Sequence, residues 1–178
     1  MRISKNNSTM RKLNTWLIWS GFLLILQSFI ISKIQVYGFL NPYIYVGIFL
    51  LAPTYLGRIS FLFLGAVIGA WIDFQIMSGG IHMMASSLLC YFRPKILDFV
   101  IPRADEEDLA FSPIDIGIGK WLIYAGIGII LHHAYLFSVD AHSLNEPLLL
   151  IWRTFISSIA STLLITSVLY FSKNQLDK

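Results

Sequence analysis

The chain has 178 residues, of which 56% are hydrophobic and 13% are charged, and its mean hydropathy is +0.69. A soluble domain carries about 25% charged residues, and one of this size has too little interior to bury so many apolar side chains. The composition therefore predicts an integral membrane protein whose solvent is the lipid bilayer. The net charge of +3 comes without a dense run of Lys and Arg, which argues against a nucleic-acid-binding protein. A single cysteine, Cys90, excludes a disulfide framework and a thiolate metal cluster.

Apolar segments follow one another along the whole chain and predict an all-α, polytopic membrane protein with about six transmembrane helices in one domain, residues 1–178. We expect the spans at about 14–34, 42–56, 59–77, 81–101, 118–138 and 147–171. The first segment lacks a small-residue cleavage site, which favours a retained span over a signal peptide. The second is short and bounded by Pro42 and Pro53, so a re-entrant or partly buried piece is the alternative there.

The distribution of Lys and Arg predicts the orientation. Arg2, Lys5, Arg11 and Lys12 precede the first span and favour a cytoplasmic N-terminus. With six spans, the C-terminus and the polar loop 102–117 are then also cytoplasmic. This loop is acidic and is either a plain solvated loop or a docking surface for a cytoplasmic partner. We interpret the polar end of the fourth segment, around Arg93, as an interfacial stretch whose cations reach the headgroups.

The third segment combines small residues with a carboxylate. Gly65, Gly69 and Asp73 are spaced i, i+4, i+8 and share one helix face, and small residues at this spacing allow close helix packing. Asp73 is either a carboxylate near the interface or a buried acceptor paired with a cation. A short Ser-Gly-Gly connection follows, so we expect a hairpin that places His82 at a similar depth.

Three further ionisable residues lie within predicted spans. His132 and His133 are adjacent, point about 100° apart and lack the spacing of a metal site, which favours histidines hydrogen-bonded in helix packing. Arg153 needs a carboxylate or carbonyl partner at its depth. All these groups lie near outer connections, so we expect a structural polar cluster, or a cavity, in the outer half of the bundle. Our hypothesis is that Asp73 pairs there with Arg153 or with one of the histidines.

The sequence contains no G-x-S-x-G, H-E-x-x-H, Walker A or G-x-G-x-x-G motif. We therefore expect no enzyme activity, no metal and no cofactor.

Several stretches together resemble the MreD family of bacterial rod shape-determining membrane proteins. They are "GFLNPYIYVGIFLLAP" (38–53), "GAVIGAWIDFQIMSGGIHMMAS" (65–86), "YFRPKILDFVIPR" (91–103), "LHHAYLF" (131–137) and Arg153 in the final span. The resemblance implies a fold similar to the six-helix substrate-binding component of energy-coupling-factor transporters. It also implies a multi-pass protein of the bacterial cytoplasmic membrane.

The function implied by this resemblance is that of a non-catalytic scaffold or regulator of the cell-elongation complex, which makes lateral peptidoglycan and sets rod shape. The expected partners are an MreC-like membrane protein, an MreB-like actin homologue and the elongation synthase and transpeptidase. The alternative is a small-ligand-binding or transport membrane protein with an outer-leaflet cavity lined by the polar residues above.

Overall fold

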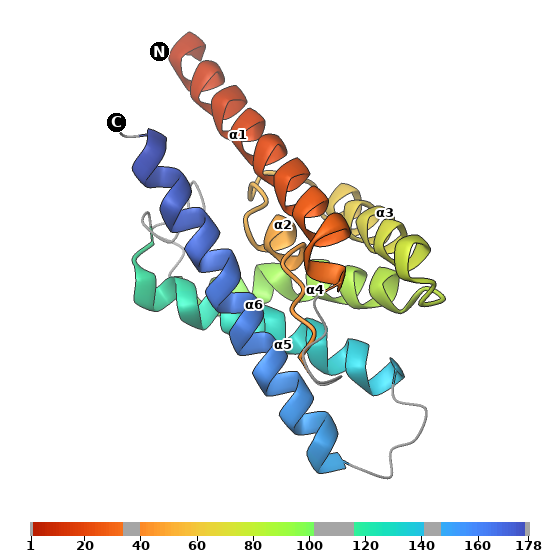
Figure 1. Cartoon of the computed structure of the whole chain (residues 1–178). Coiled ribbons are helices and arrows are strands. Elements are labelled where there is room, and N and C mark those ends of the chain that lie inside the picture. Colours follow the sequence, from red (N-terminus) through yellow and green to blue (C-terminus); the bar gives the residue numbers. More distant parts are fainter. Residues whose placement is uncertain (1, 34–39, 102–115, 141–146, 177–178) are drawn as a thin grey trace.

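The computed structural model describes residues 2–33, 40–101, 116–140 and 147–176 (Figure 1). Within these ranges the chain forms helices and connections and no strand, which confirms the all-α class. The elements are α1 (Arg2–Phe29), the 3₁₀ turn η1 (Ile31–Lys33), α2 (Val46–Leu50), α3 (Arg58–Ile76), α4 (Ile81–Val100), α5 (Ile118–Asp140) and α6 (Pro147–Leu176). The predicted cytoplasmic loop 102–117 lies almost wholly outside the described residues.

Among the described residues, four segments are long and apolar enough to cross a bilayer: Leu13–Lys33, Arg58–Ile76, Ile118–Asp140 and Pro147–Tyr170. Their outward faces carry large apolar side chains; Ile59, Phe74 and Leu148, for example, are at least 70% exposed. Helices that are apolar on the outside as well as the inside are typical of proteins in lipid. The structure therefore fits a membrane protein, and four of the six predicted spans are apolar helices of this kind in the described part of the chain.

The segment 42–56, predicted as the second span, is not a membrane-spanning helix. Only Val46–Leu50 is α-helical, and five residues rise about 7.5 Å against a hydrocarbon core of about 30 Å. Residues 44–52 are all buried, and α2 contacts α1, α4 and α5. Proline at both borders has no N–H to continue a helix. This part of the chain is thus a mostly non-helical stretch that the surrounding helices enclose. We call residues 40–52 the buried segment.

The predicted fourth span, 81–101, corresponds to α4 almost residue for residue, but α4 is not among the four apolar helices. In its polar second half, Lys95 and Asp98 are exposed, as expected, but Arg93 is not. Arg93 is only 4% exposed and its guanidinium lies 5.1 Å from the centre of the Phe61 ring. The interpretation of Arg93 as an interfacial cation is therefore wrong, because the side chain is directed into the bundle.

Helices α3 and α4 form the expected hairpin, and the face predicted for packing lies against α4. A Cβ added at Gly69 would lie 2.5 Å from the carbonyl oxygen of His82, and one at Gly65 would lie 2.7 Å from Sγ of Cys90. The connection turns through left-handed conformations at Met77, Gly79 and Gly80. Glycine on the α3 face thus lets the two backbones approach closely.

The bundle has two distinct ends. Helix α1 begins and α6 ends at the same end (Figure 1). At the other end, residues from η1, the α3–α4 turn, the last turn of α5 and the first turns of α6 line one common cavity. The buried segment runs between these ends, from Asn41 beside α6 to Ala52 beside Arg93.

Candidate functional site

The buried segment is held by side chains that bond to its backbone. Because most of it is not helical, its N–H and C=O groups need partners inside the bundle, where water and lipid supply none. The N–H of Asn41 donates to Oγ of Ser157 at 3.2 Å, and that of Tyr43 donates to Oγ of Ser161 at 2.8 Å. The N–H of Ile44 donates to Oε1 of Gln27 at 2.7 Å. Helices α6 and α1 thus satisfy the first part of the segment.

The carbonyl groups at the far end of the segment are satisfied by a second set of side chains. Tyr124 donates its hydroxyl to the carbonyl oxygen of Leu50 at 3.0 Å. Arg93 donates through Nε to Tyr124 at 2.9 Å and through Nη2 to the carbonyl oxygen of Ala52. The indole of Trp16 donates to the carbonyl oxygen of Ile48 at 3.0 Å.

The predicted histidines meet around Tyr45, which projects from the start of α2 and is fully buried. Its hydroxyl lies 3.0 Å from Nδ1 of His82 and 2.8 Å from Nε2 of His132. His133 faces α6 instead, with Nδ1 2.9 Å from the carbonyl oxygen of Ile129 and Nε2 3.3 Å from Oγ of Ser161. The two adjacent histidines therefore serve different neighbours, as their angular separation on the helix predicted.

Asp73 does not pair with Arg153 or with a histidine ring. Its carboxylate accepts from the backbone N–H groups of His82 at 2.9 Å and Met83 at 2.8 Å, and from the Ser78 hydroxyl. These N–H groups are the second and third of α4, whose N-cap is Gly80 and has no side chain to offer. Asp73 thus caps α4 from the neighbouring helix, and its charge lies at the positive end of the α4 dipole.

Arg153 takes a partner that the sequence analysis did not name. Its Nη1 lies 3.1 Å from Oδ2 of Asp140, the last residue of α5. Its guanidinium lies 4.3 Å from the centre of the Phe137 ring, and Nη2 donates at 2.8 Å to the amide oxygen of Asn41 when that amide is oriented toward it. The pairing hypothesis was wrong because helix capping already engages Asp73, whereas Asp140 lies directly opposite Arg153.

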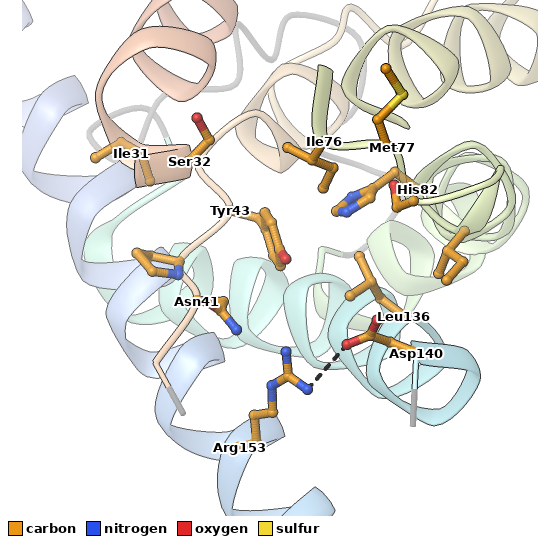
Figure 2. A pocket seen from close by; sticks show the side chains of 13 residues that line it. Ile31, Ser32, Asn41, Tyr43, Ile76, Met77, His82, Leu136, Asp140 and Arg153 are labelled. Atoms are coloured by element: carbon orange, nitrogen blue, oxygen red, sulfur yellow. Dashed lines mark hydrogen bonds and ion pairs between the residues drawn. The ribbon is translucent and has the colours of Figure 1, made fainter. Parts of the chain in front are cut away.

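A cavity of about 280 Å³ opens among these groups (Figure 2). Its polar lining consists of Ser32, Asn41, Tyr43, Ser78, His82, Asp140 and Arg153. Figure 2 shows the Tyr43 hydroxyl and the Arg153 guanidinium directed toward each other across its centre. Of the five polar residues predicted to cluster, His82 and Arg153 line the cavity, whereas the fully buried His132 and His133 do not, and neither does Asp73.

The site offers hydrogen-bond donors and one ion pair and does not resemble a metal centre. Within the described ranges, no three His, Cys, Asp or Glu side chains converge in a way that could hold a metal ion. Sequence reasoning missed the residues that attach the buried segment, above all Tyr45, Tyr124 and Gln27. The available signal was the short proline-bounded segment itself, since a broken piece at membrane depth requires polar partners on its neighbours.

No protein-family model matches the sequence, and no curated protein or solved structure is significantly similar to it.

Proposed function

We propose that this chain is a non-catalytic membrane scaffold or regulator of the bacterial cell-elongation complex, with an MreC-like membrane protein as its direct partner. The family assignment rests on the sequence motifs around residues 38–53, 65–86, 91–103 and 131–137. In this proposal an MreB-like filament protein and the elongation synthase and transpeptidase belong to the same complex. The chain lies in the cytoplasmic membrane with both termini in the cytoplasm.

The observation that supports a scaffold best is the use of the buried polar side chains. Ser157, Ser161 and Gln27 bond to N–H groups of the buried segment, and Arg93 and Tyr124 bond to its carbonyl groups. Side chains engaged in this way fix one arrangement of the bundle. A protein with one fixed arrangement can favour one assembly state of its partners by binding that state more tightly.

Six crossings also suit this topology. The buried segment runs from Ser157 of α6 to Arg93 in the second half of α4 without a full helix, and irregular backbone at membrane depth is tolerated where protein surrounds it. Counting this segment and α4 as crossings places the N-terminus, the 102–117 loop and the C-terminus on one side, where the positive-inside rule favours them.

Co-purification tests the proposal. The tagged full chain, co-expressed with the MreC-like protein encoded in the same genome, should retain that partner through purification in a mild non-ionic detergent. A tagged multi-pass protein of similar size and expression level is the control for non-specific capture. If the partner is lost both in detergent and in polymer-extracted native membrane discs, while the chain still unfolds cooperatively on heating, the proposed partnership is wrong.

The alternative, a small-ligand-binding membrane protein, is favoured by one observation, the polar cavity beside Arg153. Its volume lies just below the range of about 300–1,000 Å³ common for ligand pockets. Ligand-dependent thermal stabilisation is the test that separates it from a scaffold with a merely water-filled recess.

A further inference from the structure

The cavity presents a cation and an anion side by side. Arg153 and Asp140 are 3.1 Å apart, and their side chains are 24% and 41% exposed. Phe137 packs against the guanidinium, so this cation does not swing freely. A simple anion bound to Arg153 would be repelled by Asp140, and a simple cation at Asp140 would be repelled by Arg153. The pair therefore suits a ligand that carries both charges.

Arg153 retains hydrogen-bonding capacity beyond its two described partners. Arginine has five N–H donors, of which Nη1 serves Asp140 and Nη2 serves Asn41. Figure 2 shows the guanidinium directed into the cavity toward the Tyr43 hydroxyl. These donors can bind an anionic group that enters between them.

The buried histidines determine what His82 offers to the cavity. Nδ1 of His132 is buried without a hydrogen-bond partner, and its Nε2 lies 2.8 Å from the Tyr45 hydroxyl. An orphaned buried N–H is less acceptable than an unused acceptor, so we assign the His132 proton to Nε2, which donates to Tyr45.

The Tyr45 hydroxyl must then donate its own proton elsewhere. Nδ1 of His82, at 3.0 Å, is closer than Oγ of Ser86, at 3.3 Å, and accepts it. His82 therefore carries its proton on Nε2. Because the ring lines the cavity and faces Tyr43, with 4.9 Å between the ring centres, this N–H is a third donor for an anionic group.

From this geometry we propose that the cavity binds a small zwitterion with a primary ammonium and an anionic phosphate or carboxylate a few bonds apart. The anionic group accepts from Arg153, His82 and Tyr43, and the ammonium donates to Asp140, since a carboxylate has about four acceptor positions. A volume of about 280 Å³ corresponds to about nine water molecules at about 30 Å³ each, which suits phosphoethanolamine or an amino acid.

Two sources can supply this chemistry. The cavity lies at an end of the bundle, beside the end of α1 and the α3–α4 turn, where lipid headgroups are within reach. One source is therefore the headgroup of phosphatidylethanolamine, and the other is a free small zwitterion. The inference does not depend on the scaffold proposal, because binding is measured on the isolated chain and partnership by co-purification, so either can fail alone.

Thermal unfolding of the full chain tests the proposal. In non-ionic detergent the probes are O-phosphoethanolamine, phosphocholine, inorganic phosphate and ethanolamine. In nanodiscs, the unfolding temperature in phosphatidylcholine alone is compared with that in phosphatidylcholine containing about 30% phosphatidylethanolamine. A ligand at 100 times its Kd should raise Tm by about 5–10 °C. We expect this rise with phosphoethanolamine or with phosphatidylethanolamine, and no comparable rise with the trimethylated or single-charge probes.

Variants identify the cavity as the site. Asp140→Asn should remove the preference for a primary over a trimethylated ammonium while the chain stays folded. Arg153→Gln should abolish the rise in Tm, and Lys95→Gln, which removes one cation from an exposed position on α4 away from the cavity, should leave it unchanged.

Each outcome decides the question. A rise with the lipid alone or with the free zwitterion alone supports the proposal and identifies the source. An equal rise with inorganic phosphate shows a plain anion site and overturns it, as does the absence of any rise in both arms. A rise that persists in Arg153→Gln also overturns it, because the ligand then binds elsewhere.

Discussion

Tyr45→Phe tests whether the histidines depend on the Tyr45 hydroxyl. The change keeps the ring that packs in the core and removes only the oxygen shared by His82, Ser86 and His132. Nε2 of His132 and Nδ1 of His82 then lose their partner, and His132 already has an unsatisfied Nδ1. Leaving a buried polar group without a partner costs about 1–3 kcal/mol, so two histidine nitrogens predict a loss of about 2–6 kcal/mol in the free energy of unfolding.

A competing estimate makes the experiment decisive. Hydrogen bonds between membrane helices are worth only about 0.6 kcal/mol on average when the freed groups find other partners. Two such bonds would then cost about 1 kcal/mol. The size of the loss therefore distinguishes a network held in place by Tyr45 from one that rearranges.

The matched control is Tyr43→Phe, in the same buried segment. The Tyr43 hydroxyl points into the cavity (Figure 2), while its ring lies beside those of His82 and His132. Its removal should change stability by no more than about 0.5 kcal/mol. Unfolding in mixed micelles with increasing SDS, followed by circular dichroism, measures both variants against the unmodified chain. A loss of about 1 kcal/mol or less for Tyr45→Phe, or an equal loss for Tyr43→Phe, would refute the reasoning.

Three further predictions concern the helix hairpin and the orientation. Gly69→Ala should lower the free energy of unfolding by about 2 kcal/mol or more, because the new Cβ would lie 2.5 Å from the backbone of α4. The control is Gly126→Ala, where a Cβ would have nothing within 4 Å, and it should be neutral or stabilising in the same SDS titration. Asp73→Ala should cost about 1–3 kcal/mol and increase hydrogen exchange at the first turn of α4, since it removes the acceptor for two N–H groups; unchanged exchange there would count against the capping role. Ser143 lies between α5 and α6 in the sequence, on the side that the proposed orientation places outside the cytoplasm. In a Cys90→Ala background, Ser143→Cys should therefore react with a membrane-impermeant maleimide in intact cells. Labelling only after permeabilisation would reverse the proposed orientation.

Much of the fold could be predicted from hydrophobic pattern alone. Runs of apolar residues and the Gly65–Gly69 spacing are local signals, and they predicted α1, α3, α5, α6 and the α3–α4 packing face. The same reasoning predicted a span at 42–56, because composition measures how apolar a segment is and not whether its backbone groups have helical partners. A buried segment and a buried span have the same composition, and they differ only in the side chains that neighbouring helices supply.

The pairing of charges could not be predicted in this way. Asp73 and Arg153 were the conspicuous opposite charges at similar depth, but Asp73 caps α4 and Arg153 pairs with Asp140. A carboxylate in the last helical turn before a short connection can reach the first N–H groups of the next helix. Asp73 makes this short-range contact and no ion pair with Arg153. Asp140 lies two residues beyond the predicted span 118–138, in a connection where a charge needs no explanation.

The polar residues inside the bundle divide into two groups with different meanings. Gln27, Arg93, Tyr124, Ser157 and Ser161 bond to the backbone of the buried segment, so the broken segment itself explains their presence in apolar helices. Arg153, Asp140 and Tyr43 instead line a common cavity. An arginine within a membrane span has a high free-energy cost and usually marks a functional site. Apolar side chains would be enough if this region served packing alone. The search for a ligand therefore belongs at this end of the bundle, and the search for partners belongs on the outer helix faces.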